Sequence, residues 1–551
     1  MRRMFVFLIC VIVTLFSLRF LFNTTFFPIH DYTHVTRLVE MDRALRDGHF
    51  PVRWVRDLGY GYGEPLFSFY GPAPFYLAEV FHLLGLSFLM SIKAFLIVMT
   101  LAGFAGMYLL ASKLFGRTGG VLAASAFLLI PYRAVDLFVR GAFNELFAIT
   151  VVPWILYGML NMKEKKSWRW TGVVAGLFFL LFTSHNLMTM MFLPFLYVFG
   201  VVVLFGVKNK WTYAAKFHIA LLLGIAAAAF YLFPSYLEKG FTQVDKLIGG
   251  YGLYAYHFLY IRQFFTGVWG YGGSISGIED GLSFHLGLAH VVLAAVGIAG
   301  WFFLKKKRSE KMLAVFIAVA AALALFLTIY KSQFIWDRIP FFVYFQFPWR
   351  FLSVTTVFLP LMAGGAVLWI HKKSYRVLAV CVAIIALLFL NLKYFAPSKL
   401  LDDPNALYYS DPQRIQDSMS DTLPDYIPIG MKVIQPPFQQ QFELLGGAST
   451  KDQIQVFVDR THEKLLSFNL QKPTTLVIRT AWFPGWTVYD FDQKITYTVD
   501  TTTDFISVPL QEGQHFISIV FENTPVRAVS NLISILGLLG IAGALFYGRH
   551  D

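Results

Sequence analysis

Side chains that could act in catalysis or ligand binding are concentrated directly after the hydrophobic N-terminal segment, in residues 30–76. Asp31 stands within a few residues of the end of that segment, so its carboxylate is expected at the membrane surface, near lipid phosphates. A carboxylate within hydrogen-bond reach of an acceptor hydroxyl can remove its proton and so act as a general base. Asp is also a common N-cap residue, and a helix beginning at Tyr32 leaves both roles open.

The same segment offers groups that bind sugars and phosphates. Arg53 and Trp54 follow a proline, and Tyr60 and Tyr62 alternate with glycines. Aromatic faces stack on sugar rings, and guanidinium groups bind phosphates. The glycines taken alone are more typical of tight turns that hold no ligand.

Further ionisable residues fall at the ends of apolar runs. Asp136, Arg140 and Glu145 lie where two runs meet, and such residues at membrane depth are functional candidates by default, although Arg140 and Glu145 could simply pair. His185 occupies a similar turn, where it serves a site or satisfies backbone groups. Arg350 opens a later run, where it suits an anionic phosphate or snorkels to the interface.

Metal and nucleotide chemistry receive little support. His30 and His34 have the i, i+4 spacing of a zinc pair, but no HExxH pattern accompanies them. The only cysteines, Cys10 and Cys381, lie within apolar runs. We find neither a P-loop nor a dinucleotide fingerprint, so we expect no cofactor, with a divalent cation left open but not favoured.

Composition defines the elements that must position these residues. The chain of 551 residues is 57% hydrophobic and 14% charged, whereas soluble domains carry about 25% charged residues. This predicts a polytopic α-helical membrane protein, because apolar runs near the ~20 residues needed to cross a bilayer recur about twelve times. The runs are 5–22, 92–112, 118–132, 142–160, 170–183, 187–206, 217–234, 284–304, 312–329, 351–370, 377–392 and 529–547. The short runs 118–132 and 170–183 are typical of broken or tilted helices around a cavity.

The net charge of +13 marks a membrane side rather than a nucleic-acid surface. Basic clusters alternate along the chain so that the N-terminus is expected in the cytoplasm. The clusters lie at 2–3, 113–117, 163–166, 208–216, 305–308, 372–376 and Arg549. Segments 23–91, 238–283, 331–350 and 393–527 are then extracytoplasmic, and the N-terminal run is expected to be an uncleaved signal anchor.

The domain organisation follows from these patterns. Residues 1–395 are expected to form the transmembrane module, with 23–91 as its first outer loop. In that loop, 33–48 is predicted to be an amphipathic helix on the membrane surface and 74–89 another interfacial helix. Residues 396–527 are expected to hold a proline-rich linker (396–430) and a small antiparallel β-sandwich, and 528–551 a final span and cytoplasmic tail. The β-rich runs are 453–458, 465–468, 475–480, 487–491, 495–499, 505–509 and 515–521.

Several motifs carry a family resemblance. HDYTHVTR, LRDGHFPVRW, DLGYGYGEPLFSFYGPAPFYL, RGAFNE, SHN and QFPWR resemble the membrane family labelled 6-pyruvoyl-tetrahydropterin-synthase-related, which is similar in layout to GT-C glycosyltransferases. AWFPGWTVY near the C-terminus resembles the β domain of YfhO-type membrane glycosyltransferases. Nothing in the chain looks like a pterin synthase, which is a small soluble zinc enzyme.

The resemblance implies extracytoplasmic sugar transfer from a polyprenyl-phosphate donor to a glycan, lipid or cell-wall polymer. Asp31 matches the acidic residue of the first outer loop, and Glu145 or Asp136 matches a second acid, between which the motif does not choose. The chain lacks the WWDxG signature of metal-dependent oligosaccharyltransferases, which favours metal-independent hexosyl or pentosyl transfer.

The resulting hypothesis is an inverting single displacement in which Asp31 is the base. Arg350, Arg53 or Arg140 would stabilise the phosphate leaving group. The residues expected to bind substrate are His30, His34, Arg53, Trp54, Tyr60, Tyr62, Arg140, His185 and Arg350. Two alternatives stay open: a transporter or flippase of lipid-linked glycans, and a non-catalytic cell-envelope scaffold.

Overall fold

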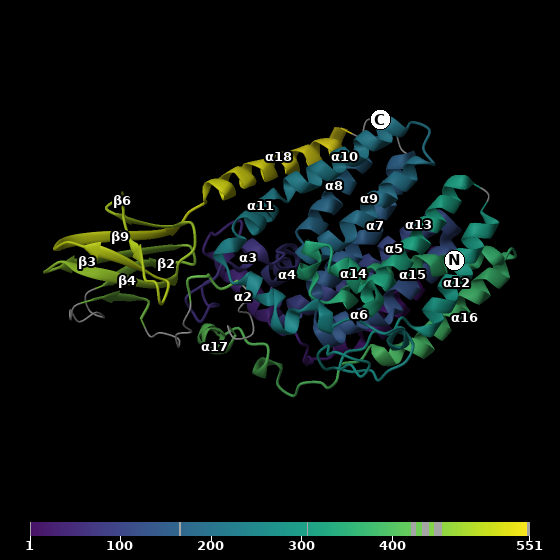
Figure 1. The fold of residues 1–551 in the computed structure, drawn as a ribbon, viewed down its shortest axis with the longest axis horizontal. Coiled ribbons are helices and arrows are strands. Elements are labelled where there is room, and N and C mark those ends of the chain that lie inside the picture. Colours follow the sequence, from purple (N-terminus) through teal and green to yellow (C-terminus); the bar gives the residue numbers. More distant parts are fainter. Residues whose placement is uncertain are drawn as a thin grey trace.

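A bundle of apolar helices carries a β domain at one end (Figure 1). The computed structural model describes residues 2–164, 167–305, 307–419, 426–431, 440–445 and 454–547. The helices up to the middle of the chain are α1 (Arg2–Leu18), α2 (His34–Arg46), α3 (Leu66–Phe69), α4 (Ala73–Leu83), α5 (Phe88–Leu129), α6 (Pro131–Val135), α7 (Phe143–Glu164), α8 (Arg169–Phe182), α9 (Asn186–Leu204), α10 (Lys210–Ala227) and α11 (Ala229–Leu237). The later helices are α12 (Leu288–Leu304), α13 (Arg308–Thr328), α14 (Gln333–Trp336), α15 (Leu352–Gly364), α16 (Lys373–Asn391), α17 (Pro412–Ser418) and α18 (Pro525–Tyr547).

Seven helical segments among the described residues are long and apolar enough to span a membrane. They are α5, α7, α9, α13, α18 and the segments Pro348–Trp369 and Lys373–Tyr394. The pair α10 and α11, bent by 68°, makes an eighth, and Val6–Phe22, α8 and α12 are shorter apolar helices. Membrane-spanning architecture is therefore present, while the total of about twelve spans stays a prediction.

Helix α5 explains why two predicted runs fall on one element. The run 92–112 and most of the run 118–132 lie within its 42 residues, and the backbone breaks between them at Gly116, where φ is 80°. A left-handed residue cannot continue an α-helix, and glycine adopts that conformation without a Cβ clash. The helix begins at a cap in which the Ser87 side chain accepts a hydrogen bond from the Met90 amide at 3.3 Å.

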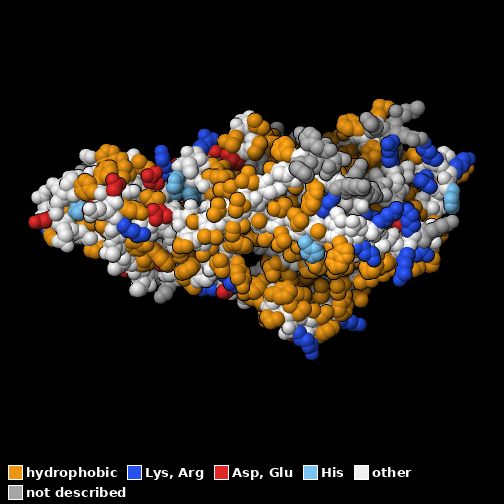
Figure 2. Space-filling view, turned by 90° about the horizontal axis from the view of Figure 1, so that it is seen from above, with side chains coloured by type: hydrophobic (Ala, Val, Ile, Leu, Met, Phe, Trp, Pro, Cys, Tyr) orange, Lys and Arg blue, Asp and Glu red, His pale blue; other side chains and the backbone are white. Residues whose placement is uncertain are grey.

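The molecular surface is divided by residue type along the long axis. Figure 2 shows a broad field of hydrophobic side chains over the helices and Lys and Arg side chains gathered at the end away from the β domain. On α18, Leu532, Leu536 and Leu539 are exposed and apolar, as expected of a lipid-facing helix. Of the predicted basic clusters, residues 165–166, Lys306 and Arg549 lie outside the described residues.

Helix α2 corrects one prediction for the first loop. An amphipathic helix on the membrane surface would expose its polar side, yet ten of the thirteen α2 residues are buried. Its polar side packs against the protein instead: Arg37 pairs with Asp31, and Glu40 accepts hydrogen bonds from the Arg56 and Asp57 amides at 2.9 and 3.2 Å. Because these groups are satisfied internally, the helix is a buried scaffold of the loop.

The β domain is a pair of antiparallel sheets. One has the order β1-β4-β8-β7 and the other β2-β3-β9-β5-β6. Each predicted run coincides with strand structure, although residue 453 lies outside the described residues, and β1 escaped prediction because it has only three residues. The strands are β1 (Phe442–Leu444), β2 (Gln455–Asp459), β3 (Glu463–Leu470), β4 (Thr474–Ala481), β5 (Trp486–Asp490), β6 (Gln493–Ile495), β7 (Thr498–Val499), β8 (Phe505–Leu510) and β9 (Gly513–Phe521).

Several contacts fix the β domain to the helices. The buried Arg527 at the start of α18 donates from Nε to Glu238 Oε2 at 2.9 Å, which ties α18 to the end of α11. The linker returns to the N-terminal loop, where Tyr408 donates to the Phe27 carbonyl at 2.6 Å. Residues 420–425 of the predicted linker lie outside the described residues. The β domain contacts the first loop directly, since Arg56 Nη2 donates to Asp459 Oδ2 at 2.8 Å and the Ala481 amide donates to the Tyr62 carbonyl at 2.9 Å.

Candidate functional site

The backbone of Asp31 is fixed against the turn that precedes α7. The His30 and Asp31 amides donate to the Val139 and Arg140 carbonyls, each at 2.9 Å. That turn is a single π-helical segment, Asp136–Arg140, which ends at Gly141 with φ 70°. A Cβ at Gly141 would lie 2.5 Å from the Ile29 side chain, so glycine allows the two segments to meet. π-helical turns are frequent at functional sites.

The Asp31 carboxylate is held by neighbouring side chains and remains reachable. Oδ1 accepts from Thr33 at 2.7 Å and from Arg37 Nη1 at 3.0 Å, and the side chain is 32% exposed. Helix α2 begins at His34 and has no side-chain cap hydrogen bond from Thr33, its N-cap residue. The N-cap role left open for Asp31 is therefore wrong, because its carboxylate turns to Arg37 instead.

Electrostatics keep Asp31 ionised. Burial opposes its charge, but the Arg37 guanidinium more than offsets that cost and holds the pKa of Asp31 well below its usual range. Arg37 itself lies 4.0 Å from the Tyr70 ring centroid and is only 3% exposed. Burial also lowers the pKa of His34 to about 4, and its Nε2 lies 2.5 Å from the Gly141 carbonyl. This contact assigns the proton of a neutral imidazole to Nε2.

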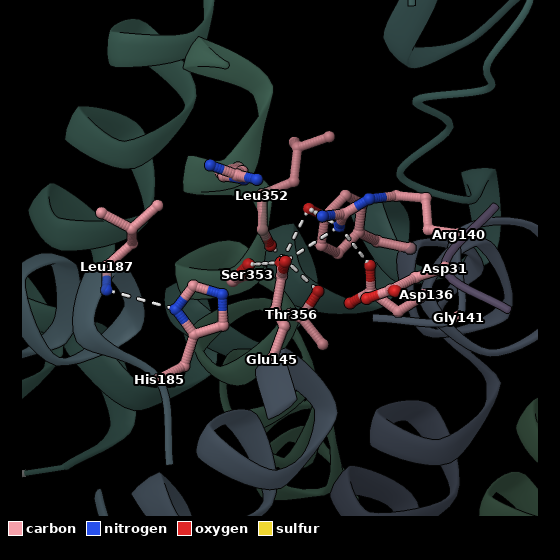
Figure 3. A network of polar contacts seen from close by, with 12 residues as sticks. Asp31, Asp136, Arg140, Gly141, Glu145, His185, Leu187, Leu352, Ser353 and Thr356 are labelled. Atoms are coloured by element: carbon pink, nitrogen blue, oxygen red, sulfur yellow. Dashed lines mark hydrogen bonds and ion pairs between the residues drawn. The ribbon is translucent and has the colours of Figure 1, made fainter. Parts of the chain in front are cut away.

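A buried network continues from Asp31 into the bundle (Figure 3). Arg140 Nη1 donates to Glu145 Oε2 at 2.9 Å and to Asp136 Oδ1 at 2.6 Å. Glu145 Oε1 accepts from Tyr132 at 2.8 Å and from the Ser353 hydroxyl. Two carboxylates thus share one guanidinium, with α7 and α15 supplying groups to the same centre.

Asp136 and Glu145 are not equivalent in this network. Oδ2 of Asp136 is buried without a hydrogen-bond partner among the described residues. Burial and the nearby Glu145 charge raise the pKa of Asp136 well above its usual range. The arrangement is consistent with a neutral Asp136 beside an Arg140–Glu145 ion pair.

Arg350 and His185 complete the cluster from two further segments. Arg350 Nη1 donates to the Phe345 carbonyl at 3.0 Å and to Gln346 Oε1 at 3.1 Å, and its buried Nε has no partner among the described residues. His185 caps α9, with Nδ1 accepting from the Leu187 amide at 3.2 Å. Burial, followed by the nearby Arg350 charge, lowers the pKa of His185 to about 4. A neutral His185 then carries its proton on Nε2.

Other expected ligand-binding residues lie elsewhere. Arg53 donates to the Phe230 carbonyl and to Asn531, each at 2.7 Å, and so joins α11 to α18. Trp54, Tyr60 and Tyr62 are buried in the hydrophobic core of the β domain. His30 lies next to Asp31, with Nε2 2.9 Å from the Tyr271 carbonyl. The structure therefore brings together Asp31, His34, Asp136, Arg140, Glu145, His185 and Arg350, with His30 at their edge, and separates Arg53, Trp54, Tyr60 and Tyr62 from them.

Sequence reasoning missed the residues that hold the charged groups. Arg37 was interpreted as part of a surface helix, and Tyr70, Tyr132 and Ser353 were not singled out. The spacing of Asp31 and Arg37 in HDYTHVTR was the available signal, because an arginine in the first turn of a helix can reach back to the preceding loop. Ser353 had no such signal, since its contact with Glu145 joins α15 to α7. Among the described residues, no group of three His, Cys, Asp or Glu side chains is arranged to hold a metal ion.

Fold and site together define a polytopic membrane protein with a polar cluster beneath a β domain. The chain belongs to the 6-pyruvoyl-tetrahydropterin synthase related family of membrane proteins, whose sequence model matches residues 67–398. That match contains Asp136, Arg140, Glu145, His185 and Arg350, whereas Asp31 and the β domain lie outside it.

Solved structures with some likeness are larger proteins. The arabinofuranosyltransferase AftD from Mycobacteria is 14% identical with a TM-score of 0.46, and the match covers 73% of this chain and 28% of AftD. The oligosaccharyltransferase of Archaeoglobus fulgidus, solved with Zn and sulfate, is 16% identical with a TM-score of 0.40, and the match covers 72% of this chain and 54% of that chain. The comparison with curated proteins gives no match.

Proposed function

We propose that this protein is an integral-membrane glycosyltransferase that moves a sugar from a polyprenyl-phosphate donor to an extracytoplasmic acceptor. The observation that carries the proposal is Asp31, an ionised and partly exposed carboxylate on the edge of a buried cationic network. A general base must be ionised and within reach of the substrate, and Asp31 meets both requirements. The broad apolar surface over the helices suits a protein that takes a lipid-linked donor from the membrane.

The proposed reaction is a single displacement with inversion. Asp31 takes the proton of the acceptor hydroxyl while the acceptor oxygen forms a bond to the anomeric carbon. The bond from that carbon to the phosphate oxygen breaks on the opposite side, and its electron pair leaves with the phosphate. Because polyprenyl phosphate is a stable anion, this leaving group needs charge stabilisation rather than protonation.

Arg350 is the cation best suited to that stabilisation. Among the described residues, it forms no ion pair with a carboxylate, and it donates to a carbonyl and an amide oxygen instead. The Arg140 charge, by contrast, is compensated by Glu145. A buried guanidinium nitrogen without a hydrogen-bond partner, on an arginine with no direct ion pair, favours an anionic ligand. His185, with Nε2–H available, is a second donor to the same phosphate.

The decisive experiment is transfer of radiolabelled sugar from a panel of polyprenyl-phosphate sugars by purified protein in lipid. Wild type should transfer one of them, and Asp31→Asn should lose activity by about a hundredfold or more, since general-base catalysis contributes roughly 10²–10⁴-fold. Asp417→Asn on the exposed side of α17 is the matched control and should retain full activity. Equal transfer by Asp31→Asn would refute its assignment as the base.

The remaining outcomes separate the alternatives. Absence of transfer with every donor, combined with movement of a lipid-linked glycan across the bilayer, would favour a transporter or flippase. Absence of both would favour an envelope scaffold. We also propose that transfer is independent of metal, so it should persist after chelation with EDTA.

A further inference from the structure

A polar cavity separate from the Asp31 cluster lies between the first loop, the linker and the β domain. Its volume is about 190 Å³, well above the roughly 10–15 Å³ that one water requires. Arg56, Asp57 and Tyr62 line it from the first loop, Gln416 from α17, and Thr480 from β4. Trp54 and Tyr62, two of the aromatic residues expected to bind substrate, thus line this cavity and not the Asp31 cluster.

The charged groups that line the cavity are Arg56, Asp57 and Lys464, and each has a partner of opposite charge just outside the lining. Asp459 accepts from Arg56 Nη2 at 2.8 Å and from Lys464 Nζ at 2.8 Å, so one carboxylate serves two cations. Asp57 pairs with Arg43 and also accepts from Gln416 Nε2 at 2.8 Å. Because each of these lining charges already has a partner, a neutral, hydroxyl-bearing ligand that exchanges hydrogen bonds with the pairs suits the cavity. Hydroxyl groups can both donate to carboxylates and accept from amide and cationic groups.

Local backbone irregularity aims side chains into the same place. The register between β4 and β8 shifts between Ile478 and Ala481, and Thr480 lies in this bulge. β-Bulges redirect side chains and are frequent beside functional sites. Gly61 has φ 79°, and a Cβ there would lie 3.1 Å from the Gln416 side chain, so glycine keeps the first loop against α17.

Helix α2 connects the cavity to Asp31. Arg37 holds Asp31, and Arg43 on the same helix holds Asp57 at the cavity. Six residues separate the two arginines, which corresponds to about 9 Å along the helix axis. An extended ligand of a few sugar units is on the scale of that separation.

We propose that this cavity is a saccharide subsite that binds a distal sugar unit of an oligosaccharide acceptor. That the ligand is the acceptor rests on the proposed glycosyltransferase function. That it is a saccharide rests on the residues that line the cavity. Gln416 and Thr480 bind the sugar hydroxyls, and Tyr62 supplies an aromatic wall. The acceptor end then extends toward Asp31.

The test is binding of neutral hexasaccharides of glucose, mannose and N-acetylglucosamine to the full-length protein in lipid nanodiscs. Titration calorimetry gives the Kd of each, with inorganic phosphate added as a competitor. We expect one hexasaccharide to bind wild type and its Kd to rise about fivefold to tenfold in Gln416→Ala and in Thr480→Val, because each loses one hydrogen-bonding group. Gln413→Ala removes a similar bond, to Asp417, on the exposed side of the same helix and should bind as wild type does.

The binding results test the saccharide subsite independently of the proposed glycosyltransferase activity. Saccharide binding that weakens in both cavity variants supports the subsite, even if wild type transfers no sugar and the proposed function fails. Equal binding by wild type and both variants overturns the subsite, even if transfer is observed. Failure of every hexasaccharide to bind, or displacement of a bound one by phosphate, also overturns it.

Discussion

At the scale of single residues, Arg37 sets the charge of Asp31. Because Arg37 stabilises the ionised carboxylate, its removal favours the protonated form, which cannot accept a proton. We expect wild-type transfer to decline only in strong acid, below the ordinary Asp pKa of about 3.9, and Arg37→Gln to shift that acid limb to higher pH. The pH profile of kcat measures the shift. Arg37→Lys retains a positive charge, so its acid limb should lie close to that of wild type. An acid limb in Arg37→Gln at the wild-type pH would contradict the role of Arg37 in keeping Asp31 ionised.

Arg350 provides a second prediction at this scale. Arg350→Gln should lower kcat/KM for the donor by about tenfold to a hundredfold, because a hydrogen bond to a charged group contributes roughly 1.5–3 kcal/mol. Steady-state transfer with varied donor concentration measures the effect. Arg338→Gln is a suitable control, since Arg338 also donates to a backbone carbonyl, that of Phe334, but is exposed. Equal losses in both variants would argue against a phosphate role for Arg350.

The structure also separates the two candidates for the second acid. Burial and the Glu145 charge raise the pKa of Asp136 and so favour its neutral form, which Asp136→Asn mimics while it can still accept from Arg140. Its transfer rate should stay within about threefold of wild type, whereas Glu145→Gln removes the Arg140–Glu145 ion pair and should lose at least about tenfold. Parallel kcat measurements with melting temperatures for both variants decide between them. A larger loss in Asp136→Asn would reverse the assignment.

At the scale of elements, the first loop and the β domain share a core. A Cβ at Gly63 would lie 2.6 Å from the Trp54 ring, and Gly63 has φ 84°. Gly63→Ala should therefore reduce the free energy of unfolding by more than the roughly 1–3 kcal/mol of backbone strain alone. Gly85→Ala is the control for backbone strain without a steric clash, because Gly85 has φ 98° but a Cβ added there would meet no atom within 4 Å. Thermal unfolding of both variants in detergent gives the comparison, and equal shifts would indicate that the Trp54 contact relaxes.

At the scale of the whole molecule, the charge distribution predicts orientation. Lysines and arginines gather at the end of the bundle opposite the β domain, and by the positive-inside rule we expect that end in the cytoplasm. Thr501→Cys, in an exposed β-domain turn, should react with a membrane-impermeant maleimide in intact cells. Lys208→Cys, at the basic end, should react only after permeabilisation. The opposite labelling pattern would invert the topology and remove the extracytoplasmic site.

Sequence by itself determined the class of this protein and most of its elements. Long apolar runs leave few soluble alternatives, because a membrane-embedded backbone must satisfy its own hydrogen bonds in helices. Alternation in the C-terminal segment likewise identified the strands of the β domain, since side chains on a strand point to opposite faces. Asp31, Asp136, Arg140, Glu145, His185 and Arg350 were all identifiable as ionisable residues near the ends of apolar runs.

Tertiary structure alone decided which of these residues meet and what charge each carries. Asp31 and Arg140 are 109 positions apart by their residue numbers, and only the pairing of their backbones brings them together. The aromatic loop residues Trp54, Tyr60 and Tyr62 have the composition of a sugar site, yet they pack into the β domain because burial of an aromatic ring is favourable wherever a partner surface exists. Composition records which groups are available, whereas their neighbours in space, often distant in the chain, set burial, pairing and pKa.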